Sequence, residues 1–298
     1  MSNSNNSAFR TTWRWRRWID PKQTGIWTER LQTAAGISWS LTDLARRSRH
    51  LAEVYVKSRL EALALQRRLG GQIRPVKPAA YLAQKPSAPL RIGGKFEIVH
   101  ENTSACRRRP PPRLFIPHGM AFGSGEHVTT AMLLHALARR SLTDCRVLDL
   151  GAGSGILALA ARLLGARKIT GTDIDPQAVR TARQNEKLNF RSPLIRWLCA
   201  DLRHWRGPSQ YDIVLANLFS AVLVDAAPGI AGAVTPGGAL WMSGILRHQV
   251  LEVTKAYRKQ RLVLLRSAMR GKWVLLQWQK QRIAPETAKK NFSMKWTQ

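Results

Sequence analysis

The feature that most limits what this chain can fold into is an alternation of strand-like and helix-like segments in its C-terminal two-thirds. Apolar strand-like segments span residues 146–150, 168–172, 194–200, 212–216, 239–243, 262–266 and 273–278. Helix-like segments lie between most of them, at residues 156–164, 176–188, 221–234 and 249–259. This alternation predicts a doubly wound α/β fold, with a mostly parallel sheet covered by helices on both faces. Only residues 267–272 link the last two strands, which predicts an antiparallel hairpin.

A glycine-rich segment follows the first of these strands. Residues 149–155 read DLGAGSG and lead into a helix rich in Ala and Leu. Glycines at such a turn let the backbone approach a ligand closely. The G-x-G-x-G spacing differs from the dinucleotide fingerprint, and the preceding carboxylate would repel phosphates but attract a sulfonium group. We therefore expect Asp149, Gly151 and Gly153 to contact S-adenosylmethionine, with a glycine turn that binds no ligand as the alternative.

Polar residues also end the next three strands. Asp173, about 20 residues beyond the glycines, is suited to accept hydrogen bonds from both ribose hydroxyls of a nucleoside. Asp175 precedes Pro176 and has the pattern of a helix N-cap. Asp201 could meet the adenine amino group or cap a loop, and the pattern does not decide between the two. Asn217 could be a turn residue, or its carboxamide oxygen could align an amine that is to be methylated.

A glycine- and threonine-rich loop precedes the first strand. Residues 121–130 read AFGSGEHVTT, which suggests a mobile loop over a ligand with Thr129 or Thr130 capping the following helix. His127 has no neighbouring residues with metal-ligand spacing, so we interpret it as loop structure or a substrate contact and expect no metal site.

The N-terminal third has a different character. Residues 1–18 combine arginines and tryptophans without acidic residues, as in an organellar transit peptide, although a disordered basic arm is our preferred interpretation. The apolar pattern of residues 42–69 predicts one long helix that ends at Gly70 and Gly71, and four prolines make 74–89 an extended connector. We therefore divide the chain into an N-terminal region (1–89), an S-adenosylmethionine-binding domain (90–280) and a basic tail (281–298).

The charge of the chain is unusual. Its net charge is +30, from 48 Lys and Arg against 18 Asp and Glu, and the excess lies mainly outside the middle of the chain. Such a charge favours polyanions, so the basic termini could contact ribosomal RNA, although a solvated basic surface is an equally good explanation. Three widely spaced cysteines and no apolar run long enough to span a bilayer predict a cytoplasmic protein without a membrane partner.

Four motifs, taken in order, resemble the ribosomal protein L-eleven methyltransferase (PrmA) family of class I methyltransferases. They are AFGSGEHVTT, VLDLGAGSGILALAA with TGTDIDPQAV, DIVLANLF and GGALWMSGIL, and the resemblance runs from about residue 90 to residue 280. It implies a seven-stranded sheet, S-adenosylmethionine as methyl donor, and N-methylation of lysine or N-terminal amines on a large-subunit ribosomal protein. It also implies cofactor contacts at Thr130, Gly151, Asp173 and Asn217.

The sequence also differs from the family pattern at several positions. Glu126, Val128, Ala152 and Phe219 differ from the commonest residues of the family, and the small α/β domain with which family members begin has no clear strand pattern here. Three other functions therefore remain open. These are an RNA methyltransferase, a nucleic-acid-binding protein that keeps the fold without turnover, and, less well matched by the glycine spacing, an NAD-dependent dehydrogenase.

Overall fold

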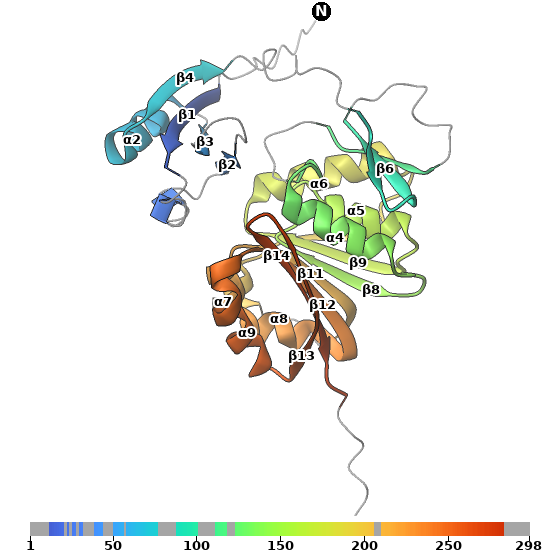
Figure 1. The fold of residues 1–298 in the computed structure, drawn as a ribbon. Helices are drawn as coiled ribbons and strands as arrows, with labels where there is room; N and C mark the ends of the chain where they lie inside the picture. Colours follow the sequence, from blue (N-terminus) through green and yellow to red (C-terminus); the bar gives the residue numbers. More distant parts are fainter. Residues whose placement is uncertain are drawn as a thin grey trace, which may run out of the picture. The chain divides into compact units, whose positions relative to one another are not determined.

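The computed structural model describes residues 12–20, 23, 26–27, 30–31, 39–43, 50–56, 58–76, 88–100, 111–117, 123–205 and 210–282. The chain forms two compact units, Met1–Ser124 and Gly125–Gln298. The boundary at 124/125 lies later than the one that the sequence suggested at 89/90. Figure 1 shows the strands and helices of both units along the chain.

The C-terminal unit is built on a seven-stranded sheet with the order β10-β9-β8-β11-β12-β14-β13. Its strands are β8 (Arg146–Leu150), β9 (Lys168–Asp173), β10 (Ile195–Cys199), β11 (Tyr211–Asn217), β12 (Val234–Leu246), β13 (Leu262–Arg270) and β14 (Trp273–Lys280). The first five run parallel, and β14 pairs antiparallel with both β12 and β13. The predicted doubly wound sheet with a terminal hairpin is therefore confirmed.

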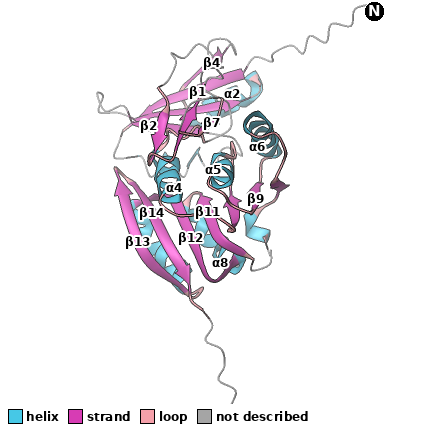
Figure 2. Ribbon diagram, turned by 90° about the vertical axis from the view of Figure 1, so that its right-hand side faces the viewer, coloured by secondary structure: helices cyan, strands magenta, loops and turns pink. Residues whose placement is uncertain are grey.

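Helices cover both faces of this sheet. On one face lie α4 (Val128–Ala138), α5 (Ile156–Leu163) and α6 (Pro176–Asn189), and on the other lie α7 (Ser220–Asp225), α8 (Ala227–Ala233) and α9 (Val250–Arg258) (Figures 1 and 2). Short 3-10 turns follow β10 (Leu202–His204) and β12 (Arg247–Gln249). The helix expected over 221–234 is split into α7 and α8, because Pro228 lies in the first turn of α8 and begins a new helix there.

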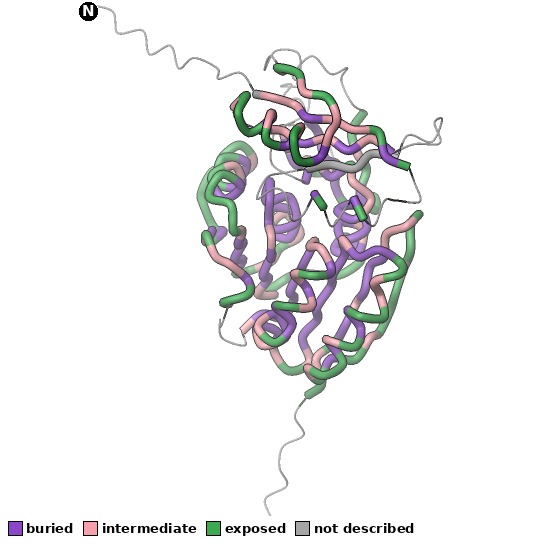
Figure 3. The backbone as a smooth tube through the Cα atoms, turned by 90° about the vertical axis from the view of Figure 1, so that its left-hand side faces the viewer, coloured by how far each residue is buried: buried purple, intermediate pink, exposed green. Residues whose placement is uncertain are grey.

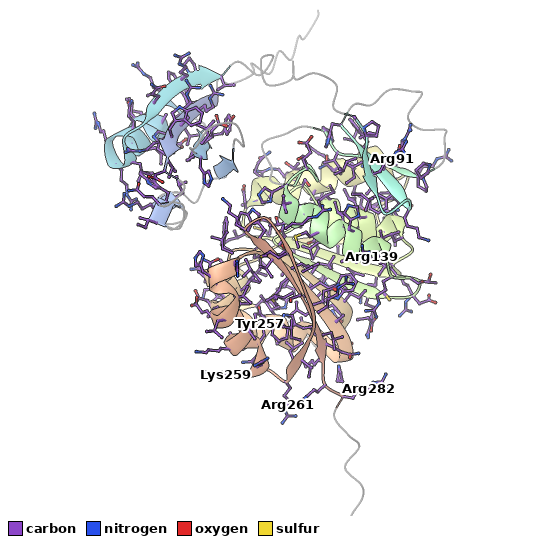
Figure 4. The ribbon with its side chains drawn as sticks, viewed as in Figure 1. Arg91, Arg139, Tyr257, Lys259, Arg261 and Arg282 are labelled. Atoms are coloured by element: carbon purple, nitrogen blue, oxygen red, sulfur yellow. The ribbon has the colours of Figure 1, made fainter. Side chains whose placement is uncertain are left out.

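The core of the C-terminal unit explains the apolar patterns. Buried Leu, Val, Ile and Ala side chains of β8, β11 and β12 pack with α7, α8 and α9. Tyr257, labelled in Figure 4, is fully buried in this cluster and donates a hydrogen bond from its hydroxyl to the Leu223 carbonyl at 2.9 Å. Figure 4 also shows the exposed side chains of Lys259, Arg261 and Arg282 near the open end of the β13–β14 hairpin.

The N-terminal unit corrects two expectations. A four-stranded antiparallel sheet with the order β2-β3-β1-β4 is formed by β1 (Thr12–Ile19), β2 (Trp39–Asp43), β3 (His50–Val56) and β4 (Gln72–Val76). The helix predicted over 42–69 is therefore wrong for its first half, and α2 spans only Arg59–Leu69. Residues 12–18 of the predicted disordered arm lie in β1, while residues 1–11 fall outside the described part of the chain.

Local sequence signals explain where α2 begins and ends. The Ser58 hydroxyl accepts a hydrogen bond from the Glu61 amide at 3.2 Å, and the Glu61 carboxylate accepts one from the Ser58 amide at 3.1 Å. This reciprocal capping box fixes the start of a helix. Gly70 ends it with a positive φ of 65°, as the sequence predicted. In β3, burial alternates residue by residue, which is the period of a strand with one covered face.

A small three-stranded sheet completes the N-terminal unit. It consists of β5 (Leu90–Ile92), β6 (Phe96–Val99) and β7 (Arg113–Phe115), in that order. Strands β5 and β6 pair antiparallel across a turn at residues 93–95, and β6 pairs parallel with β7. Strand β4 contains Pro75 at the edge of its sheet, where a missing amide hydrogen costs no ladder hydrogen bond. The rest of the predicted connector, residues 77–87, and the tail beyond residue 282 lie outside the described residues.

Candidate functional site

The glycine-rich loop lies at the carboxyl edge of the parallel strands, between β8 and α5. Gly151, Gly153 and Gly155 all have positive φ angles, of 69°, 54° and 82°. These values lie in the region that residues with a Cβ rarely adopt, so the loop requires its glycines. The Ala152 amide donates to the Thr172 carbonyl at 2.8 Å, which fixes the loop to the end of β9. The predicted cofactor contacts Gly151 and Gly153 thus lie at the sheet edge where ligands of α/β folds bind.

Asp173 joins this loop to the end of the neighbouring strand. Its Oδ2 accepts a hydrogen bond from the Gly153 amide at 2.9 Å, and its Oδ1 accepts one from the Asp175 amide at 3.0 Å. Burial raises the pKa of Asp173, although the hydrogen bonds from the Asp175 and Gly153 amides act in the opposite direction. The carboxylate is partly exposed and fixed in orientation, as an acceptor for a hydroxyl-bearing ligand should be.

Asp149 lies behind the glycine loop. Its side chain is 0% exposed, its Oδ2 accepts a hydrogen bond from the Ala158 amide at 3.1 Å, and its Oδ1 has no hydrogen-bond partner among the described residues. Burial raises the pKa of Asp149 to about 7, and the charge of Asp173 acts in the same direction. One carboxylate oxygen of Asp149 thus holds the first turn of α5, and contact of Asp149 with the cofactor stays a prediction.

Asp201 follows β10, and its carboxylate contacts Arg203, two residues further along the chain. It accepts a hydrogen bond from the Arg203 amide at 3.0 Å and pairs with the Arg203 guanidinium, with the shortest N–O distance at 2.6 Å. The guanidinium bonds lower the pKa of Asp201 to about 2. Of the two roles that the sequence left open, the structure shows the capping one, and contact with an adenine amino group stays a prediction.

Asn217 ends β11 and meets a residue of the predicted loop region. Its Nδ2 donates a hydrogen bond to the Oγ1 of Thr130 in α4 at 3.0 Å, although the two residues lie 87 positions apart. Thr130 is 1% exposed, so this contact fixes the rotation of the carboxamide. The Oδ1 of Asn217 accepts no hydrogen bond from any described residue. The two predicted site residues are thus in contact, and one carboxamide acceptor remains available for a ligand.

The residue after Asn217 explains a glycine that the sequence analysis left without a role. The Leu218 amide donates to the Ser243 carbonyl at 3.1 Å, so the chain turns away from β11 alongside β12. Gly244 has a φ of 87°, and a Cβ there would collide with the Leu218 carbonyl oxygen. A glycine within an otherwise apolar strand was the available signal, since such glycines often mark a close backbone approach.

His127 forms the N-cap of α4 instead of a threonine. Its Nδ1 lies 2.7 Å from the Thr129 Oγ1, and its ring meets Trp273 edge-on with centroids 5.3 Å apart. Burial, followed by the positive charge of Lys272, lowers the pKa of His127. The imidazole is therefore mainly neutral at physiological pH and holds the start of α4 against the terminal hairpin. Of the preceding loop, residues 121 and 122 lie outside the described part.

The family of the chain follows from a comparison of its sequence with known families. The sequence profile described as "Ribosomal protein L11 methyltransferase (PrmA)" matches residues 80–281, which is more than half of the chain. The chain belongs to this family. All the predicted site residues lie within the matched range.

Individual relatives agree with the family. A protein of Chromohalobacter salexigens named "Ribosomal protein L11 methyltransferase" is 42% identical over 190 residues, which cover 63% of this chain and 62% of that one. One of Pseudomonas paraeruginosa with the same name is 44% identical over 171 residues, covering 57% of this chain and 56% of that protein. The chain thus matches about three-fifths of the length of these relatives.

A solved structure supports the fold. The ribosomal protein L11 methylase of Lactobacillus delbrueckii subsp. bulgaricus aligns with 66% of this chain and 100% of its own, with a TM-score of 0.58 and 24% identity. The class I methyltransferase fold that the sequence predicted is therefore confirmed.

Two further features characterise the described residues. No group of three or more His, Cys, Asp or Glu side chains in this part of the chain is arranged to hold a metal ion. None of the helices formed by these residues is long and apolar enough to cross a membrane.

Proposed function

We propose that this chain is an S-adenosylmethionine-dependent N-methyltransferase that modifies lysine or N-terminal amines of a large-subunit ribosomal protein. The observation that carries the proposal is the Asn217–Thr130 hydrogen bond at the carboxyl edge of the sheet. It leaves one oriented carboxamide oxygen beside the glycine loop. Family membership supplies the reaction class, and the names of the matched relatives supply the substrate.

The residues present fit the proposed cofactor. A cradle of three positive-φ glycines allows close approach of a nucleoside, and the Asp173 carboxylate stands beside it as an acceptor for ribose hydroxyls. The buried Asp149 carboxyl behind the loop, whose Oδ1 has no hydrogen-bond partner among the described residues, can ionise beside a cationic ligand and suits it better than a pyrophosphate. Gly151, Gly153 and Asp173 would hold the cofactor, and Asn217, oriented by Thr130, would face the amine that is to be methylated.

The chain contributes orientation to the reaction. When bound, S-adenosylmethionine supplies an electrophilic methyl group on a positively charged sulfur that departs as a neutral thioether. The Asn217 Oδ1 accepts a hydrogen bond from the incoming neutral amine and points the nitrogen lone pair toward the methyl carbon. A lysine amine, with an ordinary pKa of about 10.4, must first lose a proton, and a nearby positive charge favours this loss to water. The Leu218 carbonyl, held in place beside Gly244, is a second acceptor for the same amine.

The partner is a ribosomal protein, and the charge of the chain is compatible with work on the ribosome. With a net charge of +30, the enzyme gains affinity for particles rich in phosphate. The basic termini remain candidates for ribosomal RNA contact on charge alone, since residues 1–11 and 283–298 lie outside the described part. We propose that the reaction takes place in the cytoplasm, because bacteria make and assemble their ribosomal proteins in that compartment.

Labelling of ribosomal components tests the proposal. Large ribosomal subunits from cells that lack the corresponding activity are incubated with the enzyme and methyl-radiolabelled S-adenosylmethionine, and protein and RNA are then digested separately. We expect the label in one protein, on lysine or N-terminal nitrogen, and much slower incorporation with Asn217→Ala. Label confined to RNA would favour the RNA methyltransferase instead, and cofactor binding without any label would favour a binding protein.

A further inference from the structure

The tryptophans and arginines of strand β1 are divided between the two faces of the N-terminal sheet, and each face carries both residue types. Successive side chains of a strand point to opposite faces, and residues paired directly across a sheet share a face. Trp15 pairs with Val54 and Ile73, all three on the face that packs against α2. Arg14, one residue earlier, pairs with Tyr55 and Arg74 on the opposite face. We call this opposite side the open face, and define it by Arg14, Arg16, Trp18, Glu53, Tyr55 and Arg74.

The face toward α2 uses its polar groups within the fold. Trp15 is 0% exposed and donates from Nε1 to the Gly70 carbonyl at 2.6 Å. Arg17 donates from Nη1 to the Leu69 carbonyl at 2.6 Å and stacks over Trp27 at 4.7 Å. Both satisfy carbonyls at the end of α2 that no helical amide can reach. These residues are accounted for by stability alone.

The open face has an excess of positive charge that the fold does not neutralise. Arg14 stands directly opposite Arg74, and like charges in that position destabilise a sheet. Glu53, 3.4 Å from Arg14, is the acidic residue that faces these guanidiniums from β3. Arg16 donates from Nη2 to the Gln72 Oε1 at 3.4 Å, whereas the Nε atoms of Arg14 and Arg16 are buried. An anion would therefore meet the outer guanidinium nitrogens, where it would offset the repulsion between the arginines.

Aromatic rings accompany these arginines. Trp18 is 37% exposed on the same face, and Tyr55 lies beside Arg14 on β3. Figure 3 shows the strands of this unit with buried, partly buried and exposed positions in close succession. Single-stranded nucleic acids are bound by this combination of guanidiniums for phosphates and exposed rings on which bases stack. An acidic protein segment would use the arginines but gain little from the rings.

We propose that the open face of the N-terminal sheet binds single-stranded RNA. Arg14, Arg16 and Arg74 contact phosphates, and Trp18 provides a stacking surface for a base. This site is independent of the proposed methyl transfer, because it needs neither the cofactor nor the carboxyl edge of the large sheet. It would give the enzyme an RNA anchor close to a ribosomal substrate.

Fluorescence anisotropy of the full chain with a short labelled single-stranded RNA tests the site. The variant Arg14→Gln/Arg16→Gln is compared with Arg67→Gln/Arg68→Gln, which removes the same charge from the exposed last turn of α2. Between about 50 and 200 mM salt, each lost phosphate contact should reduce the slope of log K against log salt by about 0.7. We therefore expect a slope reduced by about 1.4 for the first variant, and a smaller change for the second. Equal changes in both would overturn the site.

Two further measurements separate the alternatives. Trp18→Ala should weaken binding about fivefold or more with an unchanged salt slope, since stacking on one ring is worth ~1–3 kcal/mol. The same RNA annealed to its complement should bind more weakly than the single strand. An unchanged affinity of Trp18→Ala, or tighter binding of a polyglutamate peptide than of RNA, would contradict the proposal. Thermal unfolding of each variant verifies that the sheet is intact.

Discussion

Helices pack on both faces of the seven-stranded sheet, whereas in the N-terminal unit α2 packs on one face of the four-stranded sheet and arginines occupy the other. The polar side chains of the candidate site lie at one edge of the large sheet, and they are mainly acidic or neutral. The small sheet distributes basic groups over a face. Each arrangement suits a ligand of opposite charge, a cationic nucleoside for the edge and a polyanion for the face.

This difference shows how a chain with a net charge of +30 can hold a site for a cation. The basic residues near the open end of the β13–β14 hairpin lie at the amino ends of the parallel strands, opposite the glycine loop. Coulomb interactions between exposed charges decay over about 8 Å in physiological salt, so the two ends act separately. Net charge therefore predicts partners of the whole chain but not of an individual site.

The largest expected effect tests whether the two units are separable. Trp15→Ala removes a fully buried side chain and the hydrogen bond to Gly70. We expect it to destabilise the N-terminal unit by about 3–5 kcal/mol, as for other large-to-small core substitutions. Cofactor affinity, measured by calorimetry, should stay within about twofold of the parent. A joint loss of cofactor binding would show that the units do not behave independently.

Asp149 should make the stability of the C-terminal unit depend on pH. Its pKa is raised to about 7 in the folded chain from an ordinary value of 3.8, so between these values the folded state holds a proton that the unfolded state has released. Unfolding free energy should therefore fall as pH rises from about 4 to about 7. Across that window the difference between Asp149→Asn and the parent should change by about 4 kcal/mol, at 1.36 kcal/mol per pKa unit. Urea unfolding at several pH values measures it, and parallel curves for both proteins would contradict the burial of this charge.

Asn217→Ala should affect turnover far more than cofactor binding. The substitution removes the acceptor that orients the amine, and misplacement of a reacting group typically costs about 100-fold in rate. Steady-state kinetics with ribosomal subunits should show kcat reduced by roughly this factor, with the Kd for S-adenosylmethionine changed by less. Similar losses in both quantities would assign Asn217 to cofactor binding instead.

Thr130→Val should give the smallest of these changes. It keeps the shape of the side chain but removes the oxygen that accepts from the Asn217 Nδ2. The carboxamide is then free to rotate, and we expect kcat to fall about fivefold, in keeping with one lost orienting hydrogen bond of about 1 kcal/mol. Thr130→Ser retains the hydroxyl and should restore most of the rate. Equal kcat values for Thr130→Val and Thr130→Ser would show that the packing of this side chain, and not its hydrogen bond, sets the rate.

Much of the C-terminal unit could be predicted because its local signals agree. Apolar strands, a glycine turn and Asp175 capping α6 before Pro176 each indicate the same α/β order. The edge residues Asp173 and Asn217 could be predicted because parallel strands bring their carboxyl ends together. The pairing of Asn217 with Thr130 could not, since it joins positions 87 residues apart.

The N-terminal unit was harder for a physical reason. Residues 50–56 alternate with period two, but leucines and alanines on either side also fit a helical period, so a single helix over 42–69 accounted for both. The Ser58–Glu61 capping box was the signal that would have divided them. Asp149 illustrates a different limit. A strand pattern gives the position of a carboxylate but does not say whether it faces a ligand or the helix behind.

Calorimetric titration of S-adenosylmethionine into the parent and into Asp173→Asn tests the central claim, that the carboxyl edge of the large sheet is a cofactor site. We expect one binding site per chain in the parent. In Asp173→Asn, affinity should fall at least tenfold, because the charged acceptor for the ribose is lost while the side-chain shape is kept. Absence of binding to the parent, or equal affinity in both proteins, would contradict it.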